Sequence, residues 1–264
     1  MKVIVVTPTL GTSPWLAETV ASVAALAVGG RHVLVAPAPA VAGLRQKFPG
    51  TTVLPEPGGG MYAAINAGLA AAEWDAFTYL NDDDLLRPRF ADVVAAVAAG
   101  RDRPLLAYGS VELIDRAGAH LGTIPVSRFP AHNRRLYAER LEPVYQHGTL
   151  VTRAAWRAVG GFDASFTRCG DSEYLARLCV QGVPAIHVRG PVGAFRLHPG
   201  QFTKDRPAML ADRDRVDAKL GLREGTQRGQ AWARFCFRAG NLAVYAERLA
   251  RHGWISFDQL LERG

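Results

Sequence analysis

The sequence is poor in cysteine, with three among its 264 residues. Cys169, Cys179 and Cys236 form no CxxC pair and leave an odd one over, which argues against a disulfide framework and a structural zinc site. Long apolar runs are also lacking, since no stretch approaches the ~20 apolar residues of a membrane-spanning helix. The first apolar run, residues 3–6, is far too short for a signal-peptide core, so we expect a cytoplasmic protein.

The composition is otherwise that of a globular protein, with 48% hydrophobic and 21% charged residues. Lysine and arginine number 31 against 24 for aspartate and glutamate, a formal net charge of +7. This excess would attract nucleotide diphosphates, anionic lipid or nucleic acid without choosing between them. The aromatic residues are scattered and no basic stripe alternates with them, so we expect no nucleic-acid partner.

Short apolar runs alternate with helical patterns in the first part of the chain. Strands are predicted at 3–6, 32–36, 51–54 and 76–80, and helices at 16–27, 41–48, 61–72 and from Pro88 onward. This alternation predicts an α/β fold with a Rossmann-like, mainly parallel sheet flanked by helices. The runs 105–113 and 120–124 flank a turn and predict a hairpin, which makes the sheet mixed.

The second half of the chain predicts a loop with a short helix over 127–142, a strand at 146–151 and helices at 153–159 and 170–180. From Pro207 the pattern is helical to the end, with aromatic residues among many arginines. Core packing with a basic outer face explains this tail most simply. Peripheral contact with a membrane, at its inner face, is the second explanation.

Three consecutive carboxylates, Asp82, Asp83 and Asp84, follow the strand at 76–80 with only Asn81 between. Adjacent like charges raise one another's pKa, and a hard divalent cation with oxygen ligands relieves their repulsion. In open α/β sheets this edge is where ligands bind. The alternative is an acidic turn that caps the helix beginning near Pro88.

A glycine-rich segment, Gly58, Gly59 and Gly60, opens the helix at 61–72. The free amides of such a helix start could face a phosphate. The segment has neither a Walker lysine nor a strict GxGxxG pattern, so a flexible turn is the alternative.

Taken in order, these segments resemble the inverting nucleotide-sugar glycosyltransferases of family 2, which have the GT-A fold. The first strand ends in Thr7-Pro8-Thr9, residues 59–68 are similar to the family's G-x-Y-x-A-x-N-x-G stretch, and residues 79–84 occupy its DxD position. Gly160-Gly161-Phe162-Asp163 then precedes Gly170-Asp171-Ser172-Glu173-Tyr174, as the family's GGFD precedes its acidic catalytic motif. The resemblance covers roughly residues 3–204. It implies a GT-A domain at 1–204, with a nucleotide-sugar and metal half at 1–100, an acceptor half at 101–204, and a helical C-terminal extension at 205–264.

The resemblance also implies roles for individual residues. Asp83 would hold a Mn2+ or Mg2+ ion, and Asp84 would support the site or bind the ion through water. His198 would be a third metal ligand or a contact to the diphosphate. Asp171 would be the general base; a helix N-cap is the alternative for it, and Glu173 is the second candidate base. These two carboxylates cannot share one role, because two residues along a helix span about 200° around it.

The remaining implied site residues line the donor and acceptor pockets. The donor-binding set is Thr7, Pro8, Thr9, Gly60, Tyr62, Asn66, Asn81, Asp82, Arg196 and Lys204, with Asp82 facing the ribose. The acceptor side would include His147 and Glu173.

One departure from the family concerns the base of the donor nucleotide. Family members usually have an aspartate at the end of the second strand, where this chain has Val35-Ala36-Pro37-Ala38-Pro39. An apolar wall could stack a base but not accept its imide hydrogen, so uridine, thymidine and guanosine donors stay open. Altered or lost catalysis is a further alternative.

The sequence therefore predicts a metal-dependent transferase that moves a sugar from a nucleoside-diphosphate sugar to a saccharide or lipid-linked acceptor, in surface polysaccharide or other glycan biosynthesis. A nucleotidyltransferase is a weaker alternative, because no lysine or arginine follows the first strand in Leu10-Gly11-Thr12-Ser13. The non-enzymatic alternative is a nucleotide- or glycan-binding remnant of the same fold.

Overall fold

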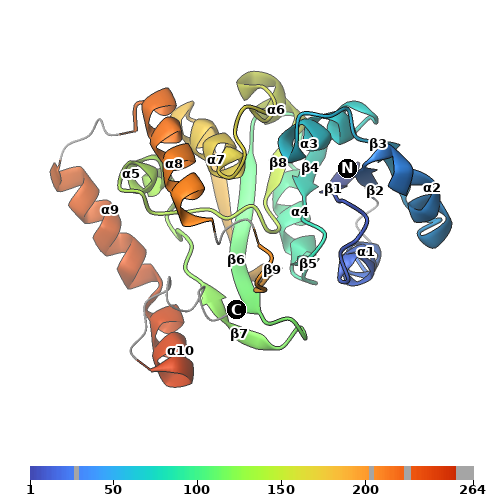
Figure 1. The fold of residues 1–264 in the computed structure, drawn as a ribbon. Coiled ribbons are helices and arrows are strands. Elements are labelled where there is room, and N and C mark those ends of the chain that lie inside the picture. Colours follow the sequence, from blue (N-terminus) through green and yellow to red (C-terminus); the bar gives the residue numbers. More distant parts are fainter. Residues whose placement is uncertain (27–29, 202–204, 223–226, 254–264) are drawn as a thin grey trace.

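The computed structural model describes residues 1–26, 30–201, 205–222 and 227–253. These residues contain one nine-stranded sheet with the order β3-β2-β1-β4-β8-β6-β9-β5, and β7 pairs with β6 (Figure 1). The strands are β1 (Val3–Pro8), β2 (Arg31–Ala36), β3 (Thr52–Pro55), β4 (Ala76–Tyr79), β5 (Leu85–Leu86), β6 (Leu106–Ile114), β7 (His120–Ile124), β8 (Leu150–Thr152) and β9 (Ala185–Arg196).

Helices cover both faces of this sheet. They are α1 (Leu16–Ala24), α2 (Ala38–Lys47), α3 (Met61–Ala70), α4 (Phe90–Ala98), α5 (Asn133–Ala138) after the 3-10 turn η1 (Pro130–His132), α6 (Arg153–Val159), α7 (Gly170–Val180), α8 (Arg206–Leu220), α9 (Gln227–Gly240) and α10 (Leu242–His252). In Figure 1, α2 lies at one end of the molecule, and α9 and α10 lie at the other.

The unbroken apolar run of β1 is explained by burial on both faces. Ile4 and Val6 pack into the largest core cluster together with residues of α3, whereas Val3 and Val5 pack on the other face with residues of α4. Both sets are almost completely buried. A strand inside a parallel sheet has this pattern because helices cover each side.

The predicted fold class is confirmed: the structure is a mixed α/β fold whose longer ladders are parallel. β1 pairs in parallel with β2 and with β4, and β6 pairs in parallel with β9. The predicted hairpin is also confirmed, because β6 and β7 pair antiparallel. The carboxyl ends of β1 and β4 therefore meet at one edge of the sheet, as the motif positions required.

Two predictions of strands were incomplete. The long strand β9 was not predicted, because Gly190 and Pro191 interrupt its apolar pattern at a point where the register with β6 shifts. The strand predicted at 146–151 begins only at Leu150, since Gln146 and Thr149 close a turn and Gly148 has φ 77°.

The helical end of the chain is confirmed where the structure describes it. Val216 of α8 and Leu222 join the largest core cluster, and Ala233 and Phe237 of α9 pack with Leu136 of α5. Among the described residues, none of the helices is both long and apolar enough to cross a membrane.

Candidate active site

The loop after β4 is organised around the buried carboxylate of Asp84, which is 0% exposed. Its Oδ1 accepts the backbone N–H of Arg196 at 3.0 Å, and its Oδ2 lies 3.1 Å from Asn81 Nδ2 and 3.0 Å from His147 Nε2. These contacts tie the end of β4 to β9 and to the turn before β8. Asp84, Asn81 and His147 were assigned to the metal, the donor and the acceptor side, and the structure brings them together. The observed partners of Asp84 are protein groups, so Asp84 supports the loop.

Arg196, at the end of β9, is buried behind the same loop. Its Nε donates to the carbonyl of Asp83 at 2.9 Å, its Nη1 to the carbonyl of Arg116 at 3.1 Å, and its Nη2 to Glu18 at 2.7 Å. A fully buried guanidinium whose groups face protein acceptors cannot reach a donor phosphate in this structure. The predicted donor contact of Arg196 is therefore replaced by a structural role that fixes the Asp83 backbone.

Asp83 and His198 form the more open part of this cluster. Asp83 Oδ2 lies 2.7 Å from His198 Nε2, and the His198 ring lies against Trp15 with ring centroids 4.5 Å apart. Burial, and then the neighbouring Asp84 and Asp82 carboxylates, raise the pKa of Asp83 to about 9. A carboxylate in such a setting is stabilised by any cation that reaches it.

Asp82 points toward the end of β1. The Thr9 hydroxyl donates to Asp82 Oδ2 at 2.5 Å and accepts the N–H of Gly11 at 2.9 Å. The Ser13 hydroxyl donates to the Asp82 carbonyl at 2.9 Å. Thr9 and Asp82, both assigned to the donor site, therefore meet at the carboxyl ends of β1 and β4, the usual ligand-binding edge of such sheets.

The motif at the start of α3 holds the segment that leads into α7. Asn66 Nδ2 donates to the Phe162 carbonyl at 2.8 Å, and its Oδ1 accepts the Phe162 N–H at 3.0 Å. The Tyr62 hydroxyl lies 3.2 Å from both Asp171 Oδ1 and the Arg168 carbonyl. Both residues were predicted to bind the donor; their observed contacts instead position the GGFD segment and Asp171.

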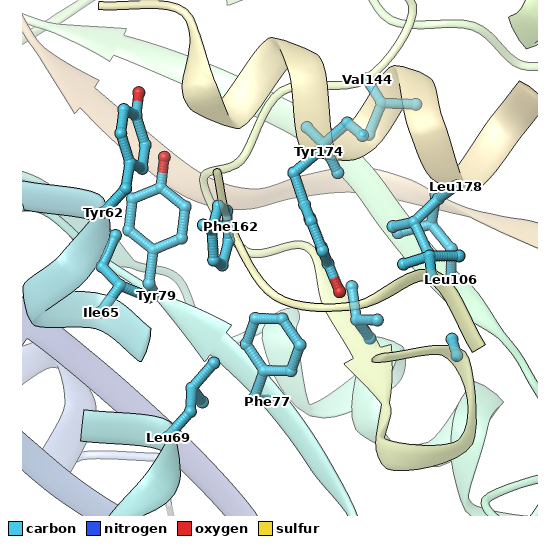
Figure 2. Close-up of a cluster of buried hydrophobic side chains, with 14 of the residues drawn as sticks. Tyr62, Ile65, Leu69, Phe77, Tyr79, Leu106, Val144, Phe162, Tyr174 and Leu178 are labelled. Atoms are coloured by element: carbon cyan, nitrogen blue, oxygen red, sulfur yellow. The ribbon is translucent and has the colours of Figure 1, made fainter. Parts of the chain in front are cut away.

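Figure 2 shows the buried hydrophobic side chains of this region. Tyr62 of α3 and Tyr79 of β4 lie side by side with their hydroxyls in the same direction, and Phe162 lies next to them. The Phe162 ring stacks on Tyr174 of α7 with centroids 4.3 Å apart. Burial, and then the Asp171 carboxylate, raise the pKa of both Tyr62 and Tyr79, so both phenols stay protonated and face Asp171 as donors.

Asp171 lies in the first turn of α7, as predicted. Burial, and then the Glu142 carboxylate, raise its pKa above the ordinary value, while the Ser172 amide and His147 oppose the rise. A carboxylate with a raised pKa is a stronger base than an exposed one. The N-cap alternative does not match the structure, because Cys169 is the N-cap residue and Asp171 lies inside the helix.

Glu142 is a site residue that the sequence analysis missed. It ends the loop at 127–142, accepts the Ser172 hydroxyl at 2.6 Å, and forms a salt bridge with Arg213 of α8 at 2.5 Å. No motif marked it, because the stretch 127–142 has little apolar period. Two carboxylates, Glu142 and Asp171, thus lie near each other at the start of α7.

Asp212 of α8 is a second residue that was missed. Its Oδ2 accepts the backbone N–H groups of Thr167 at 2.9 Å and of Arg168 at 2.8 Å. These amides belong to the segment just before α7. The helix α8, which was predicted to belong to an extension, therefore contributes to the placement of Asp171.

A small cavity lies under Asp171, with a volume of about 20 Å³. Gln146, Thr149 and Tyr174 are among its lining residues, and neither Gln146 Oε1 nor the Tyr174 hydroxyl has a hydrogen-bond partner among the described residues.

The other predicted residues are placed as follows. Thr7 is buried with its hydroxyl 2.9 Å from His32 Nε2, so the predicted donor contact of Thr7 does not fit its position. Glu173 is likewise buried, in salt bridges with Arg177 at 2.8 Å and Lys219 at 2.9 Å, which makes an acceptor contact sterically unavailable. Pro8 ends β1, Gly60 precedes α3 with φ 86°, and Lys204 lies outside the described residues.

Comparison with known proteins identifies the fold. No family model matches the sequence, and no curated protein matches it. The structure is similar to S. aureus TarS 1-349 in complex with UDP-GlcNAc, with a TM-score of 0.63 and 14% identity over 98% of this chain and 77% of that one. It is also similar to the mannosyltransferase PcManGT from Pyrobaculum calidifontis in complex with GDP-Man and Mn2+, with a TM-score of 0.58 and 18% identity over 99% of this chain and 79% of that one. The chain therefore has the fold of proteins that bind nucleotide sugars.

Proposed function

We propose that this chain is an inverting glycosyltransferase of family 2, which transfers a sugar from a nucleoside-diphosphate sugar to a saccharide or lipid-linked acceptor in surface polysaccharide or other glycan biosynthesis. The observation that carries the proposal is the convergence of two kinds of carboxylate at the end of β4. Asp83, paired with His198, lies in the loop after β4, and the buried Asp171 lies near Tyr79, the last residue of that strand. Glycosyl transfer requires this combination of a cation-binding end and a basic end.

In the proposed reaction, Asp171 accepts the proton of an acceptor hydroxyl as that oxygen attacks the anomeric carbon. The new bond between the acceptor oxygen and the anomeric carbon forms on the face opposite the diphosphate. The bond between the anomeric carbon and the diphosphate oxygen breaks, and its electron pair leaves with the nucleoside diphosphate. Because attack and departure lie on opposite faces, the configuration inverts.

Asp83 and His198 would hold a Mn2+ or Mg2+ ion, whose charge would neutralise the leaving diphosphate. Within the described residues, no group of three or more His, Cys, Asp or Glu side chains is arranged to bind a metal. The pair fits a cation that is bound through one or two protein ligands and completes its coordination with water and substrate phosphates. Asp82, held by Thr9, would face the ribose.

The bound molecules of the similar structures support a nucleotide-sugar donor, with UDP-GlcNAc in one case and GDP-Man in the other. The end of β2 leaves the base open for this chain, since Ala36 and Pro37 offer no side-chain acceptor. A binding protein without turnover is the second candidate, and this missing carboxylate is the observation that favours it.

Two measurements test the proposal. A thermal-shift screen of nucleoside-diphosphate sugars with and without Mn2+ should give its largest stabilisation for one donor only when the metal is present. In calorimetry, Asp83→Ala should then lose metal-dependent donor binding, while Asp92→Asn, an exposed aspartate on α4, should retain it. Unchanged binding of donor and Mn2+ by Asp83→Ala would disprove the metal assignment.

The base is tested separately. Asp171→Asn should keep donor affinity and reduce turnover by roughly two to four orders of magnitude. Full turnover in this variant would remove Asp171 from the role. Metal-dependent donor binding without any transfer or hydrolysis in the unaltered chain would favour the binding protein instead.

A further inference from the structure

The helices α9 and α10 leave large apolar side chains in solvent. Trp232 is 56% exposed, Phe235 60% and Leu242 67%, and Leu249 is also exposed. The Trp232 and Phe235 rings stack with centroids 5.4 Å apart. We call these four residues the outer patch; they lie on two consecutive helices at the periphery of the molecule (Figure 1).

The opposite sides of these helices are firmly attached to the protein, so the outer patch is not an unpacked core face. Ala233 and Phe237 pack with Leu136 of α5. Asn241, between the helices, donates to the Val126 carbonyl at 2.8 Å. On α10, Glu247 lies 2.6 Å from His120 Nε2 of β7.

Along the described residues of α9 and α10, the exposed charge has one sign. Residues 227–240 include three arginines and no aspartate or glutamate. Arg228 is four residues before Trp232, and Arg238 is three residues after Phe235, so both flank the aromatic pair on the same side of α9; both are exposed. The only acidic residue of α10, Glu247, turns inward to His120.

We propose that the outer patch binds the surface of an anionic lipid bilayer, with Trp232, Phe235 and Leu242 at the boundary between headgroups and acyl chains and with Arg228 and Arg238 on lipid phosphates. An amphipathic helix with aromatic and leucine residues bordered by arginines has the chemistry for this position. A second copy of the chain is a poorer occupant, because a two-fold interface through the described parts of α9 and α10 would bring the same arginines together, while Glu247 is engaged with His120. The proposal is independent of the enzymatic activity.

Co-sedimentation of the full chain with vesicles tests this inference. Binding should be strong to vesicles of phosphatidylcholine with phosphatidylglycerol, weak to phosphatidylcholine alone, and reduced by added salt. Trp232→Ser with Phe235→Ser should lower the partition coefficient by about tenfold or more. Arg228→Gln with Arg238→Gln should lower it by roughly 10- to 30-fold on anionic vesicles.

The matched control is Leu10→Ser with Leu210→Ser, which removes two exposed leucines outside α9 and α10 and should leave binding unchanged. Circular dichroism and thermal midpoints identify any variant that loses its fold, and the arginine variant keeps the apolar surface intact. Equal sedimentation with neutral and anionic vesicles, or none with either, would overturn the proposal. So would a dimer in light scattering that the Trp232 and Phe235 substitutions abolish.

Discussion

Gly170, the residue before Asp171, permits the close approach of α7 to α3. A Cβ added at this position would lie 2.5 Å from Tyr62 Cε2 and 2.7 Å from Tyr62 Cδ2 and Cζ. Ordinary carbon contacts begin near 3.5 Å, so the Tyr62 ring would have to move by about 1 Å. The ring cannot do so freely, because it is buried and stacks on Phe162 with centroids 5.9 Å apart.

Gly170→Ala should therefore destabilise the fold by about 1–3 kcal/mol, the usual cost of overpacking a core. For a chain of this size, each kcal/mol lowers the thermal midpoint by about 2–4 °C. Displacement of Tyr62 would also break its contact with Asp171. Turnover should then decrease while donor affinity is retained.

Gly43→Ala provides a matched control. Gly43 lies inside α2, and an added Cβ has nothing within 4 Å. The same substitution there should stabilise the protein by about 0.5–1 kcal/mol, because alanine loses less backbone entropy in a helix. Urea unfolding followed by circular dichroism measures both variants. If Gly170→Ala proves as stable as the unaltered chain, the packing argument for this motif is refuted.

Three further predictions concern the same segment. Glu142→Gln should shift the acidic limb of the kcat/KM profile to lower pH, since the Glu142 carboxylate raises the pKa of Asp171; an unmoved limb would contradict this coupling. Asn66→Ala should cost about 1–3 kcal/mol in urea unfolding, because it leaves both backbone groups of Phe162 without their partner. Lys219 and then the Ser165 amide hold the pKa of Asp163 below its ordinary value. The ionised Asp163 therefore stabilises the fold at any pH above that ordinary pKa, and this contribution is lost as the pH falls through the lowered pKa. At neutral pH, Asp163→Asn should accordingly have a lower thermal midpoint than the unaltered chain. Below about pH 4 its midpoint should decrease less with falling pH than that of the unaltered chain. If the midpoints of the two proteins follow parallel curves against pH, the linkage is disproved.

The sequence predicted the first half of the fold well because periodicity there reports burial directly. Residues 3–6 are apolar at every position, and β1 is covered on both faces. The strand β9 escaped prediction because its glycines serve tertiary contacts. A Cβ at Gly193 would lie 2.8 Å from the backbone carbonyl of His147, so the glycine is required by a neighbour 46 positions earlier in the chain, which no local pattern can reveal.

The candidate site shows a similar division. The order of the motifs led us to expect that their segments lie together, and in the structure the start of α3 meets the start of α7 near Tyr79 of β4. It did not indicate which side chains stay exposed. Arg196 and Glu173 were assigned to ligands by position, yet both are buried among protein partners. Whether a polar side chain of a motif stays exposed depends on the packing of remote elements, and the local sequence pattern does not report that packing.

Several buried residues of the motifs position the two carboxylates that the proposed function uses. Asn66 fixes the backbone of Phe162, Tyr62 reaches Asp171, and Arg196 fixes the backbone of Asp83. A general base and a cation-binding carboxylate must keep a set separation, and a displacement of about 1 Å can reduce turnover by two orders of magnitude. Residues that never touch a substrate are therefore under the same geometric constraint as those that do. A sequence motif in such a fold therefore includes both the residues that set this separation and the residues that react. Only the structure distinguishes the two kinds.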